Sequence, residues 1–204
     1  MYIAVAGNIG SGKTTLTTKL AERFGWEPEF ESTDANPYLE DFYHDMPRWA
    51  FHLQVQFLNN SFRQVNDITN RNKPVIQDRS IYENAHIFAK NLHVSGIMDD
   101  RDFSNYQHLF ELMASYVKVP DLLIYLKADT SRLHEQIIKR GRDYEQDIPK
   151  DYLNNLNNLY DQWISDYNWG ELLVVEMTSI DFVENQQDFE LIAAQVEERL
   201  HKLA

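Results

Sequence analysis

No cysteine occurs among the 204 residues, so disulfide bridges, thiolate metal sites and a redox role for thiols are excluded. The sequence has no tract rich in proline, glycine or serine, and no apolar run approaches the length of about 18 residues that a membrane helix needs. Met1 leads directly into Tyr2-Ile3-Ala4-Val5-Ala6, a run typical of a strand and not of a signal peptide. We therefore expect a globular cytoplasmic protein without a membrane segment.

Basic residues are scarce. The chain has 19 Lys and Arg against 32 Asp and Glu, which gives a formal net charge of −13. Charge of this sign repels phosphate backbones and argues against a nucleic acid polymer as partner. A small anionic ligand would then need a local cationic site. The length suits one domain over residues 1–204, because chains usually divide only at about 250 to 300 residues or beyond.

Short apolar runs alternate with helical patterns along the whole chain. Continuous apolar runs indicate strands buried on both faces, and their alternation with helices predicts an α/β fold with a parallel sheet. The strands are expected at residues 2–6, 27–30, 74–77, 122–126 and 172–175. Five parallel strands flanked by helices are therefore expected, without internal repeats.

Two apolar periodicities predict long helices. Between residues 49 and 68 the apolar positions Phe51, Val55, Leu58, Phe62 and Val65 recur at spacings of four and three, which is one helical face. A second helix follows Pro149, and its apolar face is Tyr152, Leu156, Leu159, Tyr160 and Trp163. A last helix is expected near residues 188–203.

A phosphate-binding loop follows the first strand. Residues Gly7-Asn8-Ile9-Gly10-Ser11-Gly12-Lys13-Thr14 match the pattern G-x-x-x-x-G-K-S/T in full, between a strand and a helical run beginning at Thr15. Glycines let the backbone N–H groups approach phosphate, and the helix N-terminus favours an anion. Lys13 supplies charge for the β- and γ-phosphates, and Thr14 a hydroxyl for Mg²⁺. The segment from Gly7 to Thr15 is therefore the predicted ATP site.

Further motifs decide between classes of phosphate-loop protein. A GTPase would carry Asn-Lys-x-Asp, but the pair Asn72-Lys73 is followed by Pro74-Val75, and no Asp-x-x-Gly switch motif occurs. A motor ATPase would generally have a strand that ends in paired acids, and no predicted strand does. These absences favour a P-loop kinase.

Polar residues follow the second and third predicted strands. Glu31 comes after the second strand, and Asp78-Arg79-Ser80 after the third. The carboxyl ends of parallel strands share one edge of a sheet, so these residues should converge with the phosphate loop. Farther along, Lys139-Arg140-Gly141-Arg142 concentrates three cations around one glycine, which suits a clamp on phosphate.

These motifs, in this order, resemble the deoxynucleoside kinase family over nearly the whole chain. The resemblance includes the deoxyadenosine, deoxyguanosine and deoxycytidine kinases and is greatest to the deoxyadenosine kinases. Its carriers are the loop from Gly7 to Thr14, Glu31, Asn36-Pro37-Tyr38-Leu39, Tyr43, Arg48-Trp49-Ala50-Phe51-His52-Leu53-Gln54, Asp78-Arg79-Ser80-Ile81-Tyr82-Glu83, Arg140-Gly141-Arg142, Glu145 and Asp181-Phe182.

The resemblance implies roles in catalysis. Glu31 would be the general base for the 5′-hydroxyl, and Arg79 would orient Glu31 and the 5′-oxygen. Asp78 would hold Mg²⁺ together with Thr14. The catalytic cations would be Lys13, Arg79, Arg140 and Arg142, the last two in a lid at about residues 140–148 that also contacts ATP.

The resemblance also implies substrate contacts. Gln54 would pair with the edge of the base, and Phe57 and Ser61 lie on the same side of its helix. Tyr43 and Glu145 would hold the 3′-hydroxyl. Without the family resemblance, Gln54 would also fit a core glutamine, Tyr43 plain packing, and Asp78-Arg79 a surface ion pair.

Three further positions bear on specificity. Asp181 and Phe182 would meet the adenine of ATP. Asn84 would lie in the base pocket, where relatives often have an aspartate together with an arginine near Ser61. Gln136 stands where many relatives begin the lid with an arginine, and Ser32-Thr33 follows Glu31 in place of Pro-Val.

The expected activity is transfer of the γ-phosphoryl group of Mg-ATP to a deoxynucleoside, with deoxyadenosine preferred, possible use of deoxycytidine or deoxyguanosine, and a homodimeric assembly. One alternative is a nucleoside monophosphate kinase of the thymidylate kinase type. Its acceptor would need extra cations, yet between Gly25 and Asn59 only Arg48 is basic apart from two histidines. The other alternative is a non-catalytic ATP-binding regulatory module.

Overall fold

The computed structural model describes residues 1–31, 36–142, 148–178 and 180–203. Ser32-Thr33, Glu145 and most of the predicted lid lie outside these residues. The chain divides into two compact units, which we call the sheet unit (Met1–Phe30, Asn72–Arg79 and Val119–Ala204) and the helical unit (Glu31–Arg71 and Ser80–Lys118). That residues 1–204 form a single domain stays a prediction. None of the described helices is long and apolar enough to cross a membrane.

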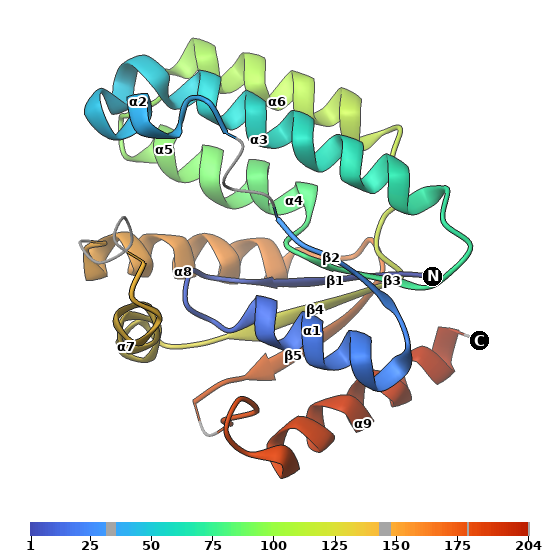
Figure 1. Ribbon diagram of the computed structural model, residues 1–204. Coiled ribbons are helices and arrows are strands. Elements are labelled where there is room, and N and C mark those ends of the chain that lie inside the picture. Colours follow the sequence, from blue (N-terminus) through green and yellow to red (C-terminus); the bar gives the residue numbers. More distant parts are fainter. Residues whose placement is uncertain (32–35, 143–147, 179, 204) are drawn as a thin grey trace. The chain divides into compact units, whose positions relative to one another are not determined.

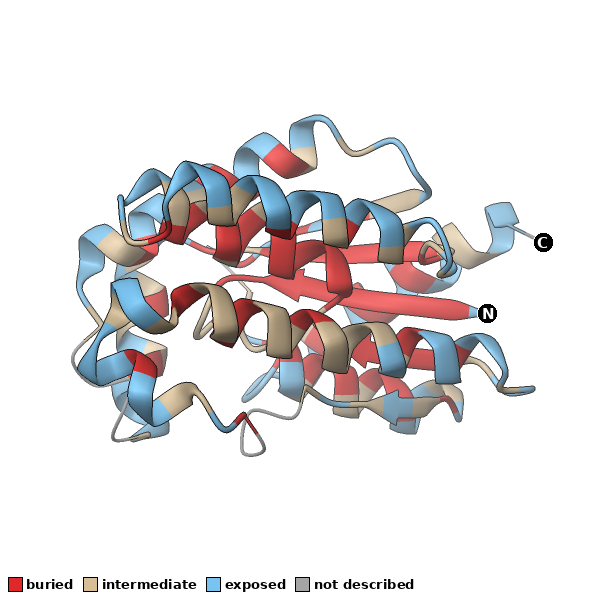
Figure 2. Ribbon diagram, turned by 90° about the horizontal axis from the view of Figure 1, so that it is seen from above, coloured by how far each residue is buried: buried red, intermediate tan, exposed pale blue. Residues whose placement is uncertain are grey.

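The sheet unit is built on five parallel strands, as predicted. They are β1 (Tyr2–Gly7), β2 (Glu27–Glu29), β3 (Val75–Asp78), β4 (Leu122–Lys127) and β5 (Glu171–Glu176), in the spatial order β2-β3-β1-β4-β5. Every residue of β1 is buried, which explains its uninterrupted apolar run (Figure 2). In the register, Val5 of β1 pairs with Asp78 of β3, so the loop after β1 begins beside the end of β3.

Helices cover both faces of this sheet (Figure 1). The sheet unit contains α1 (Lys13–Phe24), α7 (Thr130–Arg140), α8 (Lys150–Ser165) and α9 (Gln186–Leu203). Ile124 of β4 packs in the core with Leu16 of α1 and Val196 of α9. The next residue, Tyr125, points to the opposite face, where its ring stacks on Tyr160 of α8 with centroids 5.5 Å apart.

The helical unit contains the predicted long helix. Its elements are α2 (Leu39–His44), α3 (Met46–Thr69), α4 (Ile81–Glu83), the π-helix η1 (Asn84–Ala89), α5 (Lys90–Val94) and α6 (Asp100–Ala114). α3 starts three residues earlier than predicted, because the Asp45 carboxylate accepts a hydrogen bond from the Arg48 backbone N–H at 3.2 Å and Pro47 stands in the first turn.

A capping box begins the run from α4 to α5. The Ser80 backbone N–H donates to the Glu83 carboxylate at 2.8 Å, and the Ser80 side chain accepts from the Glu83 backbone N–H. The helix then widens into η1 at Asn84. Short π-helical segments occur frequently at functional sites, because the extra residue per turn re-aims side chains.

Candidate active site

The glycines of the phosphate loop have backbone angles that suit close approach to a ligand. Gly10 and Gly12 have φ values of 83° and 90°. A Cβ atom on Gly10 would lie 2.7 Å from the Leu133 carbonyl oxygen, so no side chain fits there. α1 begins at Lys13, directly after Gly12, so its N-terminal N–H groups border the loop. This is the geometry of an anion site.

Lys13 lies inside the loop. Its side chain is buried, and Nζ donates to the carbonyl oxygens of Gly7 at 2.8 Å and Asn8 at 3.0 Å. The two carbonyls therefore hold the ammonium group within the phosphate loop.

Thr14 and Asp78, the predicted Mg²⁺ ligands, are in direct contact. The Thr14 hydroxyl donates to Oδ2 of Asp78 at 2.5 Å. Asp78 is the last residue of β3, and the pairing of β3 with β1 brings its carboxylate beside the first turn of α1. One hydroxyl and one carboxylate fit Mg²⁺, which is usually held by one or two carboxylates with substrate phosphates and water. The structure thus brings the two predicted ligands together.

Arg79 adopts a left-handed backbone conformation. Its φ is 71°, the only positive φ of a non-glycine residue among those described. Its backbone N–H donates to the Val5 carbonyl at 3.0 Å, which anchors the turn to β1. A left-handed arginine is strained by about 1–3 kcal/mol, and such residues cluster at active sites.

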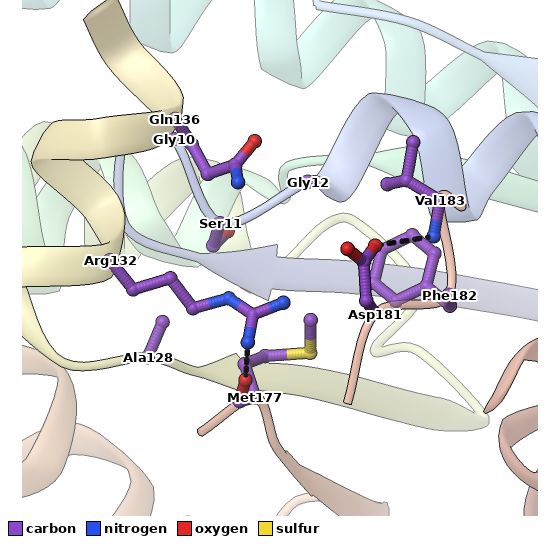
Figure 3. A pocket seen from close by; sticks show the side chains of 10 residues that line it. All are labelled: Gly10, Ser11, Gly12, Ala128, Arg132, Gln136, Met177, Asp181, Phe182 and Val183. Carbon is purple, nitrogen blue, oxygen red and sulfur yellow. Dashed lines mark hydrogen bonds between the residues drawn. The ribbon is translucent and has the colours of Figure 1, made fainter. Parts of the chain in front are cut away.

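A narrow hollow lies beside the loop, between α7 and the segment that follows β5 (Figure 3). It is lined by Gly10, Ser11, Gly12, Ala128, Arg132, Gln136, Met177, Asp181, Phe182 and Val183. Figure 3 shows Arg132 and Gln136 on one side, and Asp181, Phe182 and Val183 on the other. The hollow therefore includes Asp181 and Phe182, the residues expected to meet the adenine of ATP.

The segment after β5 is anchored by two cations. The Arg132 guanidinium donates to the carbonyl oxygens of Met177 and Ile180. Lys19 Nζ donates to the Phe182 carbonyl at 2.8 Å. The buried ring of Phe182 lies against the loop, since a Cβ on Gly12 would be 3.0 Å from Phe182 Cζ. The sequence reasoning missed Arg132, because no spacing links an arginine to backbone carbonyls some 45 residues away.

Arg140 and Arg142 flank the end of α7. Arg140 is the last helical residue, and Gly141, with φ of 72°, ends the helix in a left-handed cap. Arg140 is exposed and Arg142 partly buried. Their roles in a lid remain predictions.

Within the helical unit, Asn84 is joined to α3. Its Nδ2 donates to Ser61 Oγ at 2.7 Å and to the Phe57 carbonyl at 3.3 Å. Gln54 is 5% exposed, and its Oε1 has no hydrogen-bond partner among the described residues. Gln54, Phe57 and Ser61 share one side of α3, as predicted. A buried amide oxygen without a partner indicates a ligand contact or a bound water.

Glu31 and Tyr43 also belong to the helical unit. Glu31 is partly buried and outside any helix or strand. Tyr43, in α2, is about half exposed, and its ring lies edge-on against Phe42 with centroids 5.5 Å apart. Their roles as base and sugar contact remain predictions.

Known proteins resemble this chain over almost its full length. The family model Deoxynucleoside kinase matches residues 3–201. A deoxyadenosine/deoxycytidine kinase of Bacillus subtilis (strain 168) is 39% identical over 201 residues, which cover 98% of this chain and 93% of the relative. A deoxyguanosine kinase of the same strain is 36% identical over 205 residues, 97% and 96% of the two chains. A solved deoxyadenosine kinase from M. mycoides has a TM-score of 0.85 at 27% identity, covering 97% of this chain and 100% of that one. The chain therefore belongs to the deoxynucleoside kinase family and is an ATP-dependent kinase.

Proposed function

We propose that the protein transfers the γ-phosphoryl group of Mg-ATP to the 5′-hydroxyl of deoxyadenosine, with deoxycytidine as its second substrate. The observation that carries this preference is the orientation of the Asn84 amide, whose N–H groups are held by Ser61 and Phe57.

On the donor side, the loop from Gly7 to Thr15 binds the phosphates of ATP, and Lys13 contacts the β- and γ-phosphates. Thr14 and Asp78 hold Mg²⁺, which neutralises phosphate charge when it is bound. The hollow of Figure 3 takes the adenine. Asp181 and Phe182 line this hollow beside the phosphate loop, where the base of a nucleotide bound to the loop would enter.

In the transfer step, Glu31 accepts the proton of the 5′-hydroxyl as that oxygen bonds to the γ-phosphorus. Arg79 orients Glu31 and the 5′-oxygen. Arg140 and Arg142 stabilise the negative charge on the moving phosphoryl group through bidentate contacts. The family resemblance supports these roles, and the strained backbone of Arg79 adds support for that residue.

The Asn84 amide can present only one end to a base. The atom that faces the Phe57 carbonyl must be the amide nitrogen, because a carbonyl oxygen only accepts hydrogen bonds. With both N–H groups directed at Phe57 and Ser61, the Oδ1 atom is the end directed away from them. An acceptor at this position favours adenine, through its 6-amine, and cytosine, through its 4-amine; guanine and thymine have a carbonyl at the corresponding positions.

Gln54 fits the same two bases. Its amide can accept from the exocyclic amine and donate to the adjacent ring nitrogen. Guanine and thymine present a carbonyl and a ring N–H on that edge, so the amide would have to turn over. Some relatives carry this pairing in their names or bound ligands: one Bacillus subtilis protein is a deoxyadenosine/deoxycytidine kinase, and the M. mycoides deoxyadenosine kinase has been solved with dCMP and dCDP, with dATP and with dCTP. Other relatives, among them the 36% identical Bacillus subtilis protein, are deoxyguanosine kinases.

Competition assays test the preference. Equal mixtures of the four deoxynucleosides with Mg-ATP should give dAMP as the main product, dCMP second and little of the others. Ribonucleosides and nucleoside monophosphates are included as alternative acceptors. Faster phosphorylation of thymidine or deoxyguanosine would contradict the proposed base preference, and activity on monophosphates alone would indicate a monophosphate kinase.

Two variants test the amide orientation. Ser61→Ala removes one of the two acceptors that hold the Asn84 amide, so the ratio of kcat/KM for deoxyadenosine over deoxyguanosine should fall. Asn84→Asp can only accept, so it should keep the preference for bases with an amine. An unchanged ratio in Ser61→Ala would show that the held orientation of the Asn84 amide does not select the base. A reversed ratio in Asn84→Asp would contradict selection through an acceptor at this position.

We also propose the homodimer that the family resemblance implies. Leu112 of α6 and Tyr116 just beyond it are 57% and 75% exposed, and a second copy could cover this apolar surface. Light scattering at assay concentration tests this, and a monomeric mass would contradict it.

A further inference from the structure

Two backbone carbonyls hold Lys13 in the structure. Nζ donates to Gly7 O at 2.8 Å and to Asn8 O at 3.0 Å, and the residue is 8% exposed. In loops of this kind the lysine reaches the β- and γ-phosphates, so Lys13 must leave these carbonyls when ATP binds. A buried carbonyl that loses its donor is unfavourable. The affinity for ATP therefore depends on the other donors to Gly7 and Asn8.

Each of the two carbonyls has a second donor. The Tyr160 hydroxyl donates to Gly7 O at 2.7 Å, and the Ser11 backbone N–H donates to Asn8 O at 3.1 Å. Neither donor has to move when Lys13 turns toward a phosphate. Both carbonyls thus keep a hydrogen bond after Lys13 has left.

The Tyr160 hydroxyl is fixed in place by packing. Tyr160 is fully buried in α8, and its ring stacks on Tyr125 of β4 at an interplanar angle of 18°. The hydroxyl therefore cannot follow Lys13, and its bond to Gly7 belongs to the core of the sheet unit.

α8 holds the start of the loop at a second point. Asn8 Nδ2 donates to the Leu153 carbonyl at 2.9 Å and to Asn157 Oδ1 at 2.7 Å. Asn157 Nδ2 in turn donates to the Ala128 carbonyl at 3.0 Å, just after β4. These bonds position the loop independently of Lys13. The start of the loop therefore stays attached to α8 when the lysine side chain moves.

We propose that Tyr160 is a positioning residue for ATP: its hydroxyl keeps Gly7 O hydrogen-bonded while Lys13 moves to the phosphates, which makes the movement of Lys13 less unfavourable. The proposal rests on the proposed function only in that the loop binds the polyphosphate of ATP. Tyr160 touches no substrate atom and acts through Gly7 and Lys13.

The substitution Tyr160→Phe tests the proposal, because it removes the hydroxyl and keeps the ring against Tyr125. By calorimetric titration, the Kd for ATP should rise about five- to tenfold. The Kd for AMP should not change, because AMP has no β- or γ-phosphate to attract Lys13. The kcat at saturating ATP and the KM for deoxyadenosine should stay at their original values. Tyr106→Phe, which removes the hydroxyl of another fully buried tyrosine whose hydroxyl has no hydrogen-bond partner among the described residues, is the control and should leave all of these values unchanged.

A double-mutant cycle separates this role from general packing. In a Lys13→Met background, Tyr160→Phe should not change the affinity for ATP, since no ammonium group leaves Gly7. An equal loss in that background would overturn the proposal, as would an equal loss for AMP or no loss for ATP when Lys13 is present. If Lys13→Met binds ATP too weakly to titrate, the comparison of ATP with AMP decides. Failure of the unsubstituted protein to bind ATP would instead refute the proposed function.

Discussion

We predict that His86 makes the stability of this protein depend on pH. His86 lies in η1, and its ring meets Phe110 of α6 edge-on with centroids 5.4 Å apart. Burial, together with the nearby positive charge of Lys90, lowers the pKa of His86 from 6.5 to about 4. The ring is therefore neutral in the folded protein at pH values where it would be charged in the unfolded chain.

The sign of the effect follows from proton binding. Above about pH 7.5 the ring is neutral in both states and contributes almost no pH dependence. Between pH 6.5 and about 4 the unfolded chain binds a proton that the folded protein does not, so the free energy of unfolding falls as the pH falls. The shift of about 2.5 pKa units corresponds to a total loss of about 3 kcal/mol, of which about 2 kcal/mol is lost at pH 5.

Urea unfolding between pH 4 and pH 8 measures this dependence. The substitution His86→Gln keeps a polar side chain that does not titrate, so the variant should lose about 2 kcal/mol less than the original protein between pH 8 and pH 5. His108→Gln, at an exposed position of α6, is the control and should leave the pH dependence almost unchanged. Parallel pH profiles of the original protein and His86→Gln would refute the reasoning.

Three further predictions concern transfer. Lys13→Ala should reduce phosphoryl transfer by at least about 100-fold, because no other described cation replaces its charge inside the loop; near-normal turnover in steady-state assays would remove the loop from the mechanism. Glu31→Gln should lower kcat by about 10² to 10⁴ while nucleoside affinity changes far less, because the amide cannot accept the proton; a loss confined to affinity would make Glu31 a binding residue. Arg140→Ala should lower kcat by about 10², more than it weakens ATP binding, and equal losses would contradict a role in the transition state.

The sheet could be predicted because its physical cause is local. Strands covered on both faces need uninterrupted apolar residues, so runs such as 2–6 and 122–126 are visible in the sequence, and the structure has strands at both. The π-helix η1 could not be predicted. In a π-helix each backbone N–H donates to the carbonyl five residues earlier, and in an α-helix to the carbonyl four residues earlier. The residue types from Asn84 to Ala89 do not indicate which of the two patterns forms.

The phosphate loop was predictable for the same reason, since its glycines and lysine are adjacent in the sequence. Arg132 and Tyr160 were not, because each acts on backbone carbonyls that are distant in the sequence. Tyr160 was assigned to the apolar face of its helix, and its ring does pack in the core; only the position of its hydroxyl distinguishes it from Leu156 or Leu159. Every residue has a backbone carbonyl, so the sequence does not show which carbonyl a side chain will contact. Such contacts can be identified only in the structure.

The left-handed backbone at Arg79 limits how this protein could be made more stable. Glycine would adopt a φ of 71° without the steric strain that arginine bears there. Selection for thermal tolerance alone would thus favour Arg79→Gly, and the same change would remove the guanidinium group that we assign to the 5′-oxygen. If Arg79 has the role that we propose, folding and turnover make opposite demands on this one side chain. Engineering of a more heat-tolerant form should leave this position alone and alter residues outside the turn that follows β3.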